Sequence, residues 1–257
     1  MLATRRPRAQ SCRSLNRGAA CYSSFVSYSE HRLKVGRTAR WGLIGALSPA
    51  TREVWMALHG YAQLAAAFAA GARWPVSPAR AFVFPEALQR FYAASTTEPL
   101  ANRTAPVVAS WMTRDARDDD IADNNEYLDA LWSAVRVRAP NADLVSFGFS
   151  QGGATAARWS AARAAAGVPP AWLVLWGSGL PEEVDLAAHA PFRSVPVTFV
   201  VGDRDPWVTP KRVAAERARF ASAAFPVDVR VFSGGHRLDD DALAELATVR
   251  DTPTPGL

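Results

Sequence analysis

Short apolar runs alternate with longer segments of mixed polarity along most of the chain. Bounded by Pro, Gly or charged residues, the apolar runs predict buried strands over residues 53–58, 81–84, 144–147, 171–176, 195–201 and 227–232. Apolar residues at helical spacing predict helices between them, over residues 63–72, 118–135, 152–166, 211–224 and 239–249. In the fourth helix we expect Val213, Phe220 and Ala224 to face inward.

The order of these elements predicts the fold class. Strands alternating with helices indicate βαβ units and a mainly parallel sheet, and nearly continuous apolar strands are typical of burial on both faces. Two further apolar segments, residues 33–35 and 41–45, flank Gly36 and predict an N-terminal hairpin. We therefore predict a single α/β domain over residues 32–257, a doubly wound sheet with helices on both faces, preceded by a disordered extension over residues 1–31.

Composition is consistent with a globular domain. The 257 residues are 49% hydrophobic and 21% charged, which suffices for one core without metal or disulfide staples. Apolar runs all fall short of the roughly 18–20 residues that a membrane span needs. We expect a protein without stable membrane insertion.

The net charge of +5 comes from the N-terminal tail. Residues 1–29 hold five arginines and no acid, which leaves 24 of the 29 basic residues against 24 acidic ones in the rest. Residues 30–257 therefore carry no net positive charge, and proteins that bind the phosphate backbone of nucleic acids usually do. Both cysteines, Cys12 and Cys21, lie in this tail, so the body has no disulfide framework or cysteine metal site. Without a secretory apolar segment the expected location is cytoplasmic. A translation start set too far upstream is one alternative interpretation of the tail, and an organelle transit peptide is a less favoured one.

The clearest chemical signal is GFSQG at residues 148–152, directly after a predicted strand and before a predicted helix. A serine at such a junction lies on a tight turn with its hydroxyl exposed above the sheet edge. The flanking glycines are needed because side chains there would collide with the strand and the helix. Ser150 is therefore the candidate nucleophile, and a helix N-cap is the alternative.

A serine nucleophile requires a histidine base, and the chain has four histidines. His31 precedes the first strand and His189 lies in a loop rich in Pro and Ala. His59 suits a turn beside an oxyanion site. His236, in the SGGH segment after the last predicted strand, lies on a loop free to reach over the sheet and is the candidate base.

The acid is expected between these two residues, at the end of a strand. The segment GDRDP at residues 202–206 supplies Asp203 and Asp205. Asp205 is favoured because the second carboxylate extends further toward the histidine loop. Asp203 is the alternative, and Glu182 or Glu183 after the preceding strand comes third.

An oxyanion hole needs backbone N–H donors. The turn LHGY at residues 58–61 follows an early central strand, so the N–H groups of Tyr61 and Gln151 are the predicted donors. No cofactor or metal is expected; the acidic run at residues 118–120 has no accompanying histidine and is typical of a helix start.

Four segments in this order resemble serine esterases of the α/β-hydrolase fold, most of all the phospholipase/carboxylesterase branch: HGYAQ (59–63), GFSQGG (148–153), GDRDPWV (202–208) and GGH (234–236). The likeness extends over roughly residues 32–250. It places Ser150, Asp205 and His236 on the family's triad positions, and Tyr61 and Gln151 on its oxyanion positions. The resemblance implies hydrolysis of carboxylic esters without a cofactor; thioesters and lysophospholipids are other family substrates.

Some residues depart from that family. Its members often carry an acid or a glycine soon after His-Gly, where this chain has Tyr61-Ala62-Gln63. Residues 110–115 stand where relatives place a substrate-facing loop. Bulky apolar residues of this region and after other strands predict a hydrophobic substrate pocket: Phe84, Phe91, Tyr92, Trp111, Met112 and Trp207.

The sequence thus predicts a serine hydrolase that cleaves small-molecule esters of short to medium acyl chains through an acyl-enzyme. A thioesterase or lysophospholipase of the same fold is one alternative. A small serine peptidase would use the same three residues, but this chain has no room for the cap or propeller that such enzymes often add. A non-catalytic binding protein is disfavoured because such proteins commonly lose one of the three.

Overall fold

The structure, a computed structural model, describes residues 28–93, 105–186 and 190–251. Most of the predicted basic extension, with Cys12 and Cys21, lies outside the described residues, as does His189. The chain divides into two units, residues 1–37 and 38–257. In the first unit, residues 28–37 have no regular secondary structure and are solvent-exposed. The second unit holds the sheet and all the helices described below.

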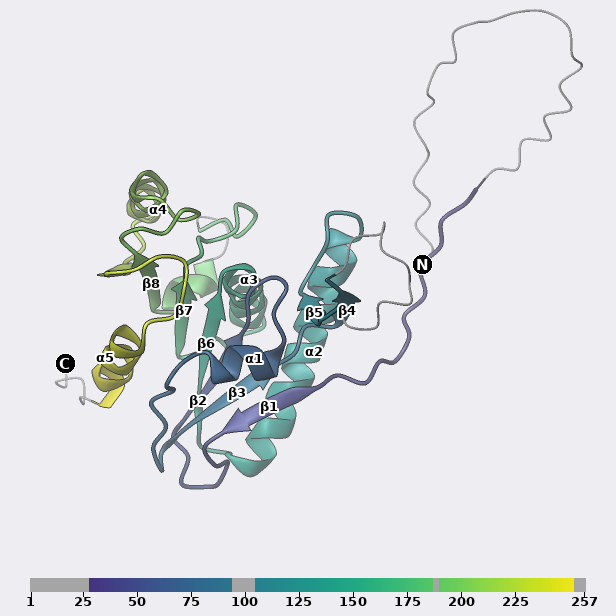
Figure 1. Ribbon diagram of the computed structural model, residues 1–257, viewed down its shortest axis with the longest axis horizontal. Coiled ribbons are helices and arrows are strands. Elements are labelled where there is room, and N and C mark those ends of the chain that lie inside the picture. Colours follow the sequence, from purple (N-terminus) through teal and green to yellow (C-terminus); the bar gives the residue numbers. More distant parts are fainter. Residues whose placement is uncertain (1–27, 94–104, 187–189, 252–257) are drawn as a thin grey trace, which may run out of the picture. The chain divides into compact units, whose positions relative to one another are not determined.

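In the described part of the chain, seven strands form one sheet in the order β1-β3-β2-β6-β7-β8-β9 (Figure 1). β1 runs antiparallel to β3, and the other neighbouring strands are parallel. The strands are β1 (Trp41–Ile44), β2 (Glu53–Leu58), β3 (Arg80–Pro85), β6 (Asp143–Phe149), β7 (Trp172–Trp176), β8 (Val197–Gly202) and β9 (Asp228–Phe232). The mainly parallel sheet predicted from the apolar runs is confirmed.

Helices cover both faces of the sheet, as predicted. Alternate side chains of β2 show the two layers, since successive side chains of a strand point to opposite faces. Val54, Met56 and Leu58 lie in a core with residues of α2 (Arg117–Arg138), α3 (Gln151–Ala165) and α4 (Pro210–Ser222). Trp55 and Ala57 lie in a second core with residues of α1 (Ala65–Ala70) and α5 (Asp240–Asp251). The carboxyl ends of the parallel strands therefore share one sheet edge, where the predicted site residues follow.

The predicted N-terminal hairpin is wrong. Residues 33–35 form no strand, and the side chains of Leu33 and Val35 are exposed. β1 instead pairs with β3, with Trp41 opposite Pro85 and Ile44 opposite Phe82. A short apolar segment does not specify its partner, and the buried strand β3 offers an apolar neighbour that the segment at 33–35 does not.

The inward position predicted for Ala224 is also wrong. α4 ends at Ser222, and Ala224 lies beyond it with a φ of 50° and an exposed side chain. Phe220 is buried as predicted, and Val213 is half-buried. The chain turns out of the helix at Ala224 so that Phe225 can pack against the ring of Phe220, with centroids 5.2 Å apart.

A small antiparallel pair, β4 (Gln89–Tyr92) and β5 (Val107–Ser110), was not predicted. Each strand is only four residues long, and β4 contains the polar residues Gln89 and Arg90, so the sequence pattern does not mark the pair. Its position matters for the site, because Ala109 forms a β-bridge to Gln63 and its carbonyl accepts the Ala62 N–H at 2.9 Å. The pair therefore holds the turn that follows β2.

Candidate active site

Ser150 lies between β6 and α3, on the turn that the sequence predicted. Its backbone has a φ of 54° and a ψ of −119°, a left-handed conformation that is costly for a residue with a side chain. The turn is held by the Ser150 N–H, which donates to the Trp176 carbonyl at 2.9 Å, and by the Gly153 N–H, which donates to the Ser150 carbonyl at 2.9 Å. Strain of this kind at a strand–helix junction is typical of an exposed nucleophile.

The glycines around Ser150 are required by close backbone approaches. A Cβ on Gly148 would lie closer than 3.0 Å to backbone atoms of Gly152 and Gly153. A Cβ on Gly152 would meet the carbonyl oxygens of Leu58 and His59 equally closely. As predicted, a side chain at either glycine would clash with its neighbours. The clashing atoms belong to the backbone and cannot rotate away.

We expect Gly148→Ala to destabilise the protein by about 1–3 kcal/mol, the usual cost of overpacking a closely packed site. In a protein of this size each kcal/mol lowers the melting temperature by roughly 2–4 °C. Gly42→Ala is the matched control, because a Cβ there would lie at an ordinary 3.8 Å from the Phe84 Cβ. Thermal unfolding measures the melting temperature of both variants. A Gly148→Ala protein with the melting temperature of the wild type would show that Gly148 is not closely packed.

His236 and Asp205 are joined across the sheet edge. The Asp205 Oδ2 and the His236 Nδ1 lie 2.7 Å apart, a charge-assisted hydrogen-bond distance. Asp205 follows β8, and His236 lies between β9 and α5. The His236 ring also packs on the Phe149 ring, with centroids 4.8 Å apart, and beside Gly177, where any Cβ would collide with the imidazole. Phe149 precedes Ser150 directly, so the imidazole lies beside the serine turn.

No hydrogen bond joins the Ser150 hydroxyl to His236 among the described residues. Such contacts are often long before substrate binds and tighten in the complex. Because Asp205 holds the Nδ1 side of the ring, the Nε2 side is the one left for a proton from the serine.

The Asp205 carboxylate is oriented by the chain that follows it. Its side chain is 1% exposed, and its Oδ1 accepts the N–H groups of Trp207 at 2.8 Å and Val208 at 2.9 Å. Burial acts to raise the pKa of Asp205, but the Val208 amide, His236 and the Trp207 amide outweigh burial, and the pKa lies below its ordinary value. Asp205 is thus held as an ionised acceptor for the imidazole.

The other acids suggested by the sequence have different partners. Asp203 Oδ1 accepts the Gly234 N–H at 2.9 Å, which ties the end of β8 to the loop that carries His236. Glu183 forms ion pairs with Arg158 and Arg117. Burial acts to raise the pKa of Glu183, but its own backbone N–H and the two arginines outweigh burial, and the pKa lies below its ordinary value. Glu182 is exposed. Of these carboxylates, the structure brings only Asp205 to His236.

Two backbone N–H groups, those of Tyr61 and Gln151, lie in turns next to the serine and have no backbone or side-chain acceptor in the described part of the chain. In the turn after β2, the Gly60 N–H donates to Gln63 Oε1 and the Ala62 N–H to Ala109, while the Tyr61 N–H between them has no acceptor among the described residues. Gln151 opens α3, and the first N–H groups of a helix have no partner within it. The carbonyls of Leu58 and His59 approach Gly152 closely, so the two turns are neighbours.

His59 is a buried part of this turn. Its Nε2 accepts the Ala87 N–H at 3.1 Å, so its Nδ1 carries the proton and donates to the Gly60 carbonyl at 2.8 Å. Burial lowers the pKa of His59 further than the Gly60 carbonyl and Glu86 raise it. The ring of His59 thus connects Gly60 to Ala87 and holds the turn that carries Tyr61.

The side chain of Gln151 anchors residues 110–112. Its Oε1 accepts the Trp111 N–H at 3.0 Å, and its Nε2 donates to Ser110 Oγ at 3.0 Å and to the Met112 carbonyl at 3.1 Å. Sequence reasoning assigned Gln151 only a backbone role. Its side chain connects the start of α3 to the end of β5, and so links the serine turn to the segment at residues 110–112.

The residues predicted to line a pocket are placed differently. Trp111 is 1% exposed, and its indole N–H donates to the His59 carbonyl at 2.8 Å. Its side chain therefore packs beneath the turn that follows β2 and stabilises it. Met112 is half-buried and its sulfur contacts Arg158 at 3.3 Å. Trp207 is 66% exposed beside Asp205. Phe84 is fully buried in the core, whereas Phe91 and Tyr92 lie on the exposed strand β4.

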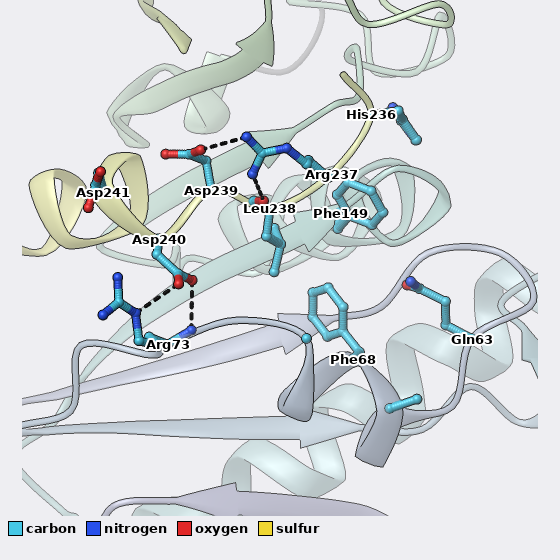
Figure 2. Close-up of a pocket in the computed structure, with 12 residues that line it drawn as sticks. Gln63, Phe68, Arg73, Phe149, His236, Arg237, Leu238, Asp239, Asp240 and Asp241 are labelled. Atoms are coloured by element: carbon cyan, nitrogen blue, oxygen red, sulfur yellow. Dashed lines mark hydrogen bonds and ion pairs between the residues drawn. The ribbon is translucent and has the colours of Figure 1, made fainter. Parts of the chain in front are cut away.

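A cleft of about 560 Å³ opens beside His236 instead (Figure 2). It lies between α1 and the segment from His236 to Asp241, with Phe149 at its side. Trp111, Met112 and Trp207 do not line it. The sequence contained no direct signal for this cleft, because its walls come from three segments that are more than 70 residues apart in the chain.

The described ranges contain no group of three or more histidine, cysteine, aspartate or glutamate side chains placed to hold a metal ion. Within the same ranges, no helix has the length and apolar character needed to cross a membrane. The acidic run at residues 118–120 lies in the first turn of α2, as predicted for a helix start.

A mainly parallel sheet with helices on both faces and a strained serine turn after a central strand define the α/β-hydrolase fold. Residues 51–242 match the model of a family described as Serine hydrolase (FSH1), which covers most of the chain. The chain belongs to this serine hydrolase family. The α/β-hydrolase fold and the serine hydrolase class expected from the sequence are confirmed.

Solved structures show the same fold at low sequence identity. Acyl-protein thioesterase 2 of Zea mays has a TM-score of 0.60 and 15% identity, over 83% of this chain and 98% of that one. A carboxylesterase from Mesorhizobium loti has a TM-score of 0.55 and 15% identity, over 79% and 90%. The Bacillus cereus carboxylesterase has a TM-score of 0.54 and 15% identity, over 83% and 93%. No curated protein matches the chain in sequence.

Proposed function

We propose that this serine hydrolase cleaves carboxylic esters of small molecules with Ser150 as nucleophile, His236 as general base and acid, and Asp205 as the group that orients His236. The observation that carries the proposal is the 2.7 Å contact between Asp205 and His236, beside a strained serine turn. A buried carboxylate on Nδ1 fixes the tautomer whose Nε2 accepts a proton, which a serine needs in order to attack. The N–H groups of Tyr61 and Gln151 serve as the oxyanion hole.

The reaction proceeds in two balanced halves. The Ser150 oxygen attacks the ester carbonyl while His236 takes its proton, and the carbonyl oxygen becomes an oxyanion that the two N–H groups stabilise. The C–O bond to the alcohol breaks as His236 returns the proton to the leaving oxygen, which leaves an acyl-Ser150 ester. Water then attacks that ester with the same proton transfers and releases the carboxylic acid.

An ester substrate is supported by the likeness of the fold to carboxylesterases. A thioester is the second candidate, because the fold is also that of an acyl-protein thioesterase. The same residues serve for either, since only the leaving atom differs. A matched pair that shares one acyl group, ethyl butyrate and its ethanethiol analogue, discriminates between them by kcat/KM.

The test of the proposed function is covalent trapping. A fluorophosphonate probe should transfer its phosphonyl group to Ser150 and displace fluoride, and mass spectrometry of peptides should place the adduct on the peptide that contains residues 148–153. The same preparation should hydrolyse p-nitrophenyl acetate, butyrate or octanoate, and labelled protein should be inactive. An adduct on another serine, or hydrolysis that survives complete labelling, would refute the assignment.

A further inference from the structure

Trp176, the last residue of β7, contacts both segments that carry the proposed nucleophile and base. Its carbonyl accepts the Ser150 N–H at 2.9 Å, which holds the serine turn. Its indole N–H donates to the Arg237 carbonyl at 2.8 Å, and Arg237 directly follows His236. One residue therefore connects the end of a central strand to the serine turn and to the loop of His236.

The Trp176 side chain has a fixed place in the core. It is fully buried, and its ring packs on those of Phe147 and Phe232, with centroids 6.0 and 5.5 Å apart. A ring enclosed in this way has little room to reorient, because protein interiors are close-packed. The indole N–H is therefore a donor at a fixed position relative to the sheet.

Other groups hold the loop on the opposite side of His236. Asp203 Oδ1 accepts the Gly234 N–H at 2.9 Å, and the Arg204 N–H donates to the Gly234 carbonyl at 2.8 Å. These bonds fix the chain two residues before the histidine, and the Trp176 indole fixes it one residue after. The imidazole thus lies on a short segment that is anchored at both ends.

The imidazole also fits closely against the residue that follows Trp176. Gly177 has a φ of 55°, and a Cβ on it would lie 2.9 Å from the His236 Cε1 and 3.0 Å from its Nδ1. The same Cβ would lie 3.4 Å from the Asp205 Oδ2. A small displacement of the loop would therefore move the ring relative to the strand end that holds the serine turn.

We propose that Trp176 is a positioning residue whose indole N–H sets the place of His236 relative to Ser150. The proposal rests on the proposed function, because proton transfer is what makes that placement matter. A base must lie within hydrogen-bond reach of the proton that it removes, and a misplacement of about 1 Å can lower a rate by about 10²-fold. Since Trp176 is fully buried, it acts through the two segments and not on the substrate.

Trp176→Phe removes the indole donor and keeps an aromatic ring in the core. Trp172→Phe is the matched control, because Trp172 is buried on the same face of β7 and its indole N–H donates to Thr198 Oγ1 at 3.0 Å. Each variant loses one indole hydrogen bond, but only the first loses the bond to the loop of His236. A protein with 3-benzothienylalanine at residue 176 is the second variant, since this amino acid keeps the two-ring shape of tryptophan and has sulfur in place of the N–H.

We expect Trp176→Phe and the benzothienylalanine protein to lower kcat for p-nitrophenyl butyrate by about 10- to 100-fold. KM should stay unchanged, because His236 acts in both halves of the reaction and both slow alike. Trp172→Phe should change neither constant. Full activity of the benzothienylalanine protein, an equal loss in Trp172→Phe, or a loss that lies in KM would each overturn the proposal.

Hydrogen exchange tests the same anchor without turnover. The amides of residues 233–238 should exchange faster in the benzothienylalanine protein than in the wild type or the Trp172→Phe protein, because local opening becomes easier. Unchanged exchange would overturn the proposal. Failure of the proposed function has a different signature, since the wild type would then not react with the fluorophosphonate probe, and the exchange rates would still show whether the indole holds the loop.

Discussion

Replacement of Ser150 by alanine is expected to lower kcat for p-nitrophenyl butyrate by about 10⁶-fold. The loss is this large because the histidine and the aspartate contribute to catalysis only through the serine nucleophile. Alanine keeps the fold, because the backbone hydrogen bonds of the turn involve the Ser150 N–H and carbonyl and not its hydroxyl. The residual rate measures what oxyanion stabilisation and binding supply alone. Stopped-time hydrolysis assays on purified protein, with thermal unfolding as the check of folding, give the result.

Ser133→Ala is the control for this prediction. Ser133 is exposed on α2, and its hydroxyl donates to the Asp129 carbonyl of the same helix at 2.8 Å, so it takes no part in the serine turn. It should retain full activity. Equal activity of Ser150→Ala and the wild type would show that the strained serine has a structural role and would remove the basis of the proposed mechanism.

The second large effect is expected at Asp205. Asp205→Asn should lower kcat by about 10⁴-fold, because an amide N–H₂ facing Nδ1 favours the tautomer that cannot accept the serine proton at Nε2. The amide oxygen can still accept the N–H groups of Trp207 and Val208, so the loop keeps its shape. Kinetic assays of the variant with p-nitrophenyl butyrate measure the loss.

Asp203→Asn provides the matched comparison, because Asp203 lies two positions before Asp205 and directly follows the same strand, β8. Its amide oxygen can accept the Gly234 N–H as the carboxylate does, so activity should fall only slightly. A large loss in Asp203→Asn with an active Asp205→Asn protein would reverse the assignment of the acid.

Most of the core elements could be predicted from the sequence because each is specified locally. β2, β3, β6, β7 and β8 are nearly continuous apolar runs, and such runs are typical of strands buried on both faces of a parallel sheet. The turn at Ser150 was predictable for the same reason, since its glycines and its strand–helix context are adjacent in the chain. β4, β5 and the pairing of β1 were missed, because short strands depend on their neighbours for burial.

The pocket prediction illustrates the same limit. Trp111 and Phe84 are large and apolar, and the sequence does not distinguish a wall of a cleft from the core beneath it. The structure buries both, and it forms the cleft from Phe68, Phe149 and Leu238, which belong to three distant segments. Which face of an aromatic side chain meets solvent depends on packing between elements.

By itself the sequence determined the α/β class, the serine turn and the short list of residues that accompany it, because local periodicity and adjacent glycines dictate them. Only the tertiary structure decided that Asp205 and not Asp203 reaches His236, that the Tyr61 N–H finds no acceptor among the residues the structure describes, and that a cleft opens beside the imidazole. These depend on distances between strand ends that are remote in the chain. Such distances are set by the packing of the sheet and its helices as a whole.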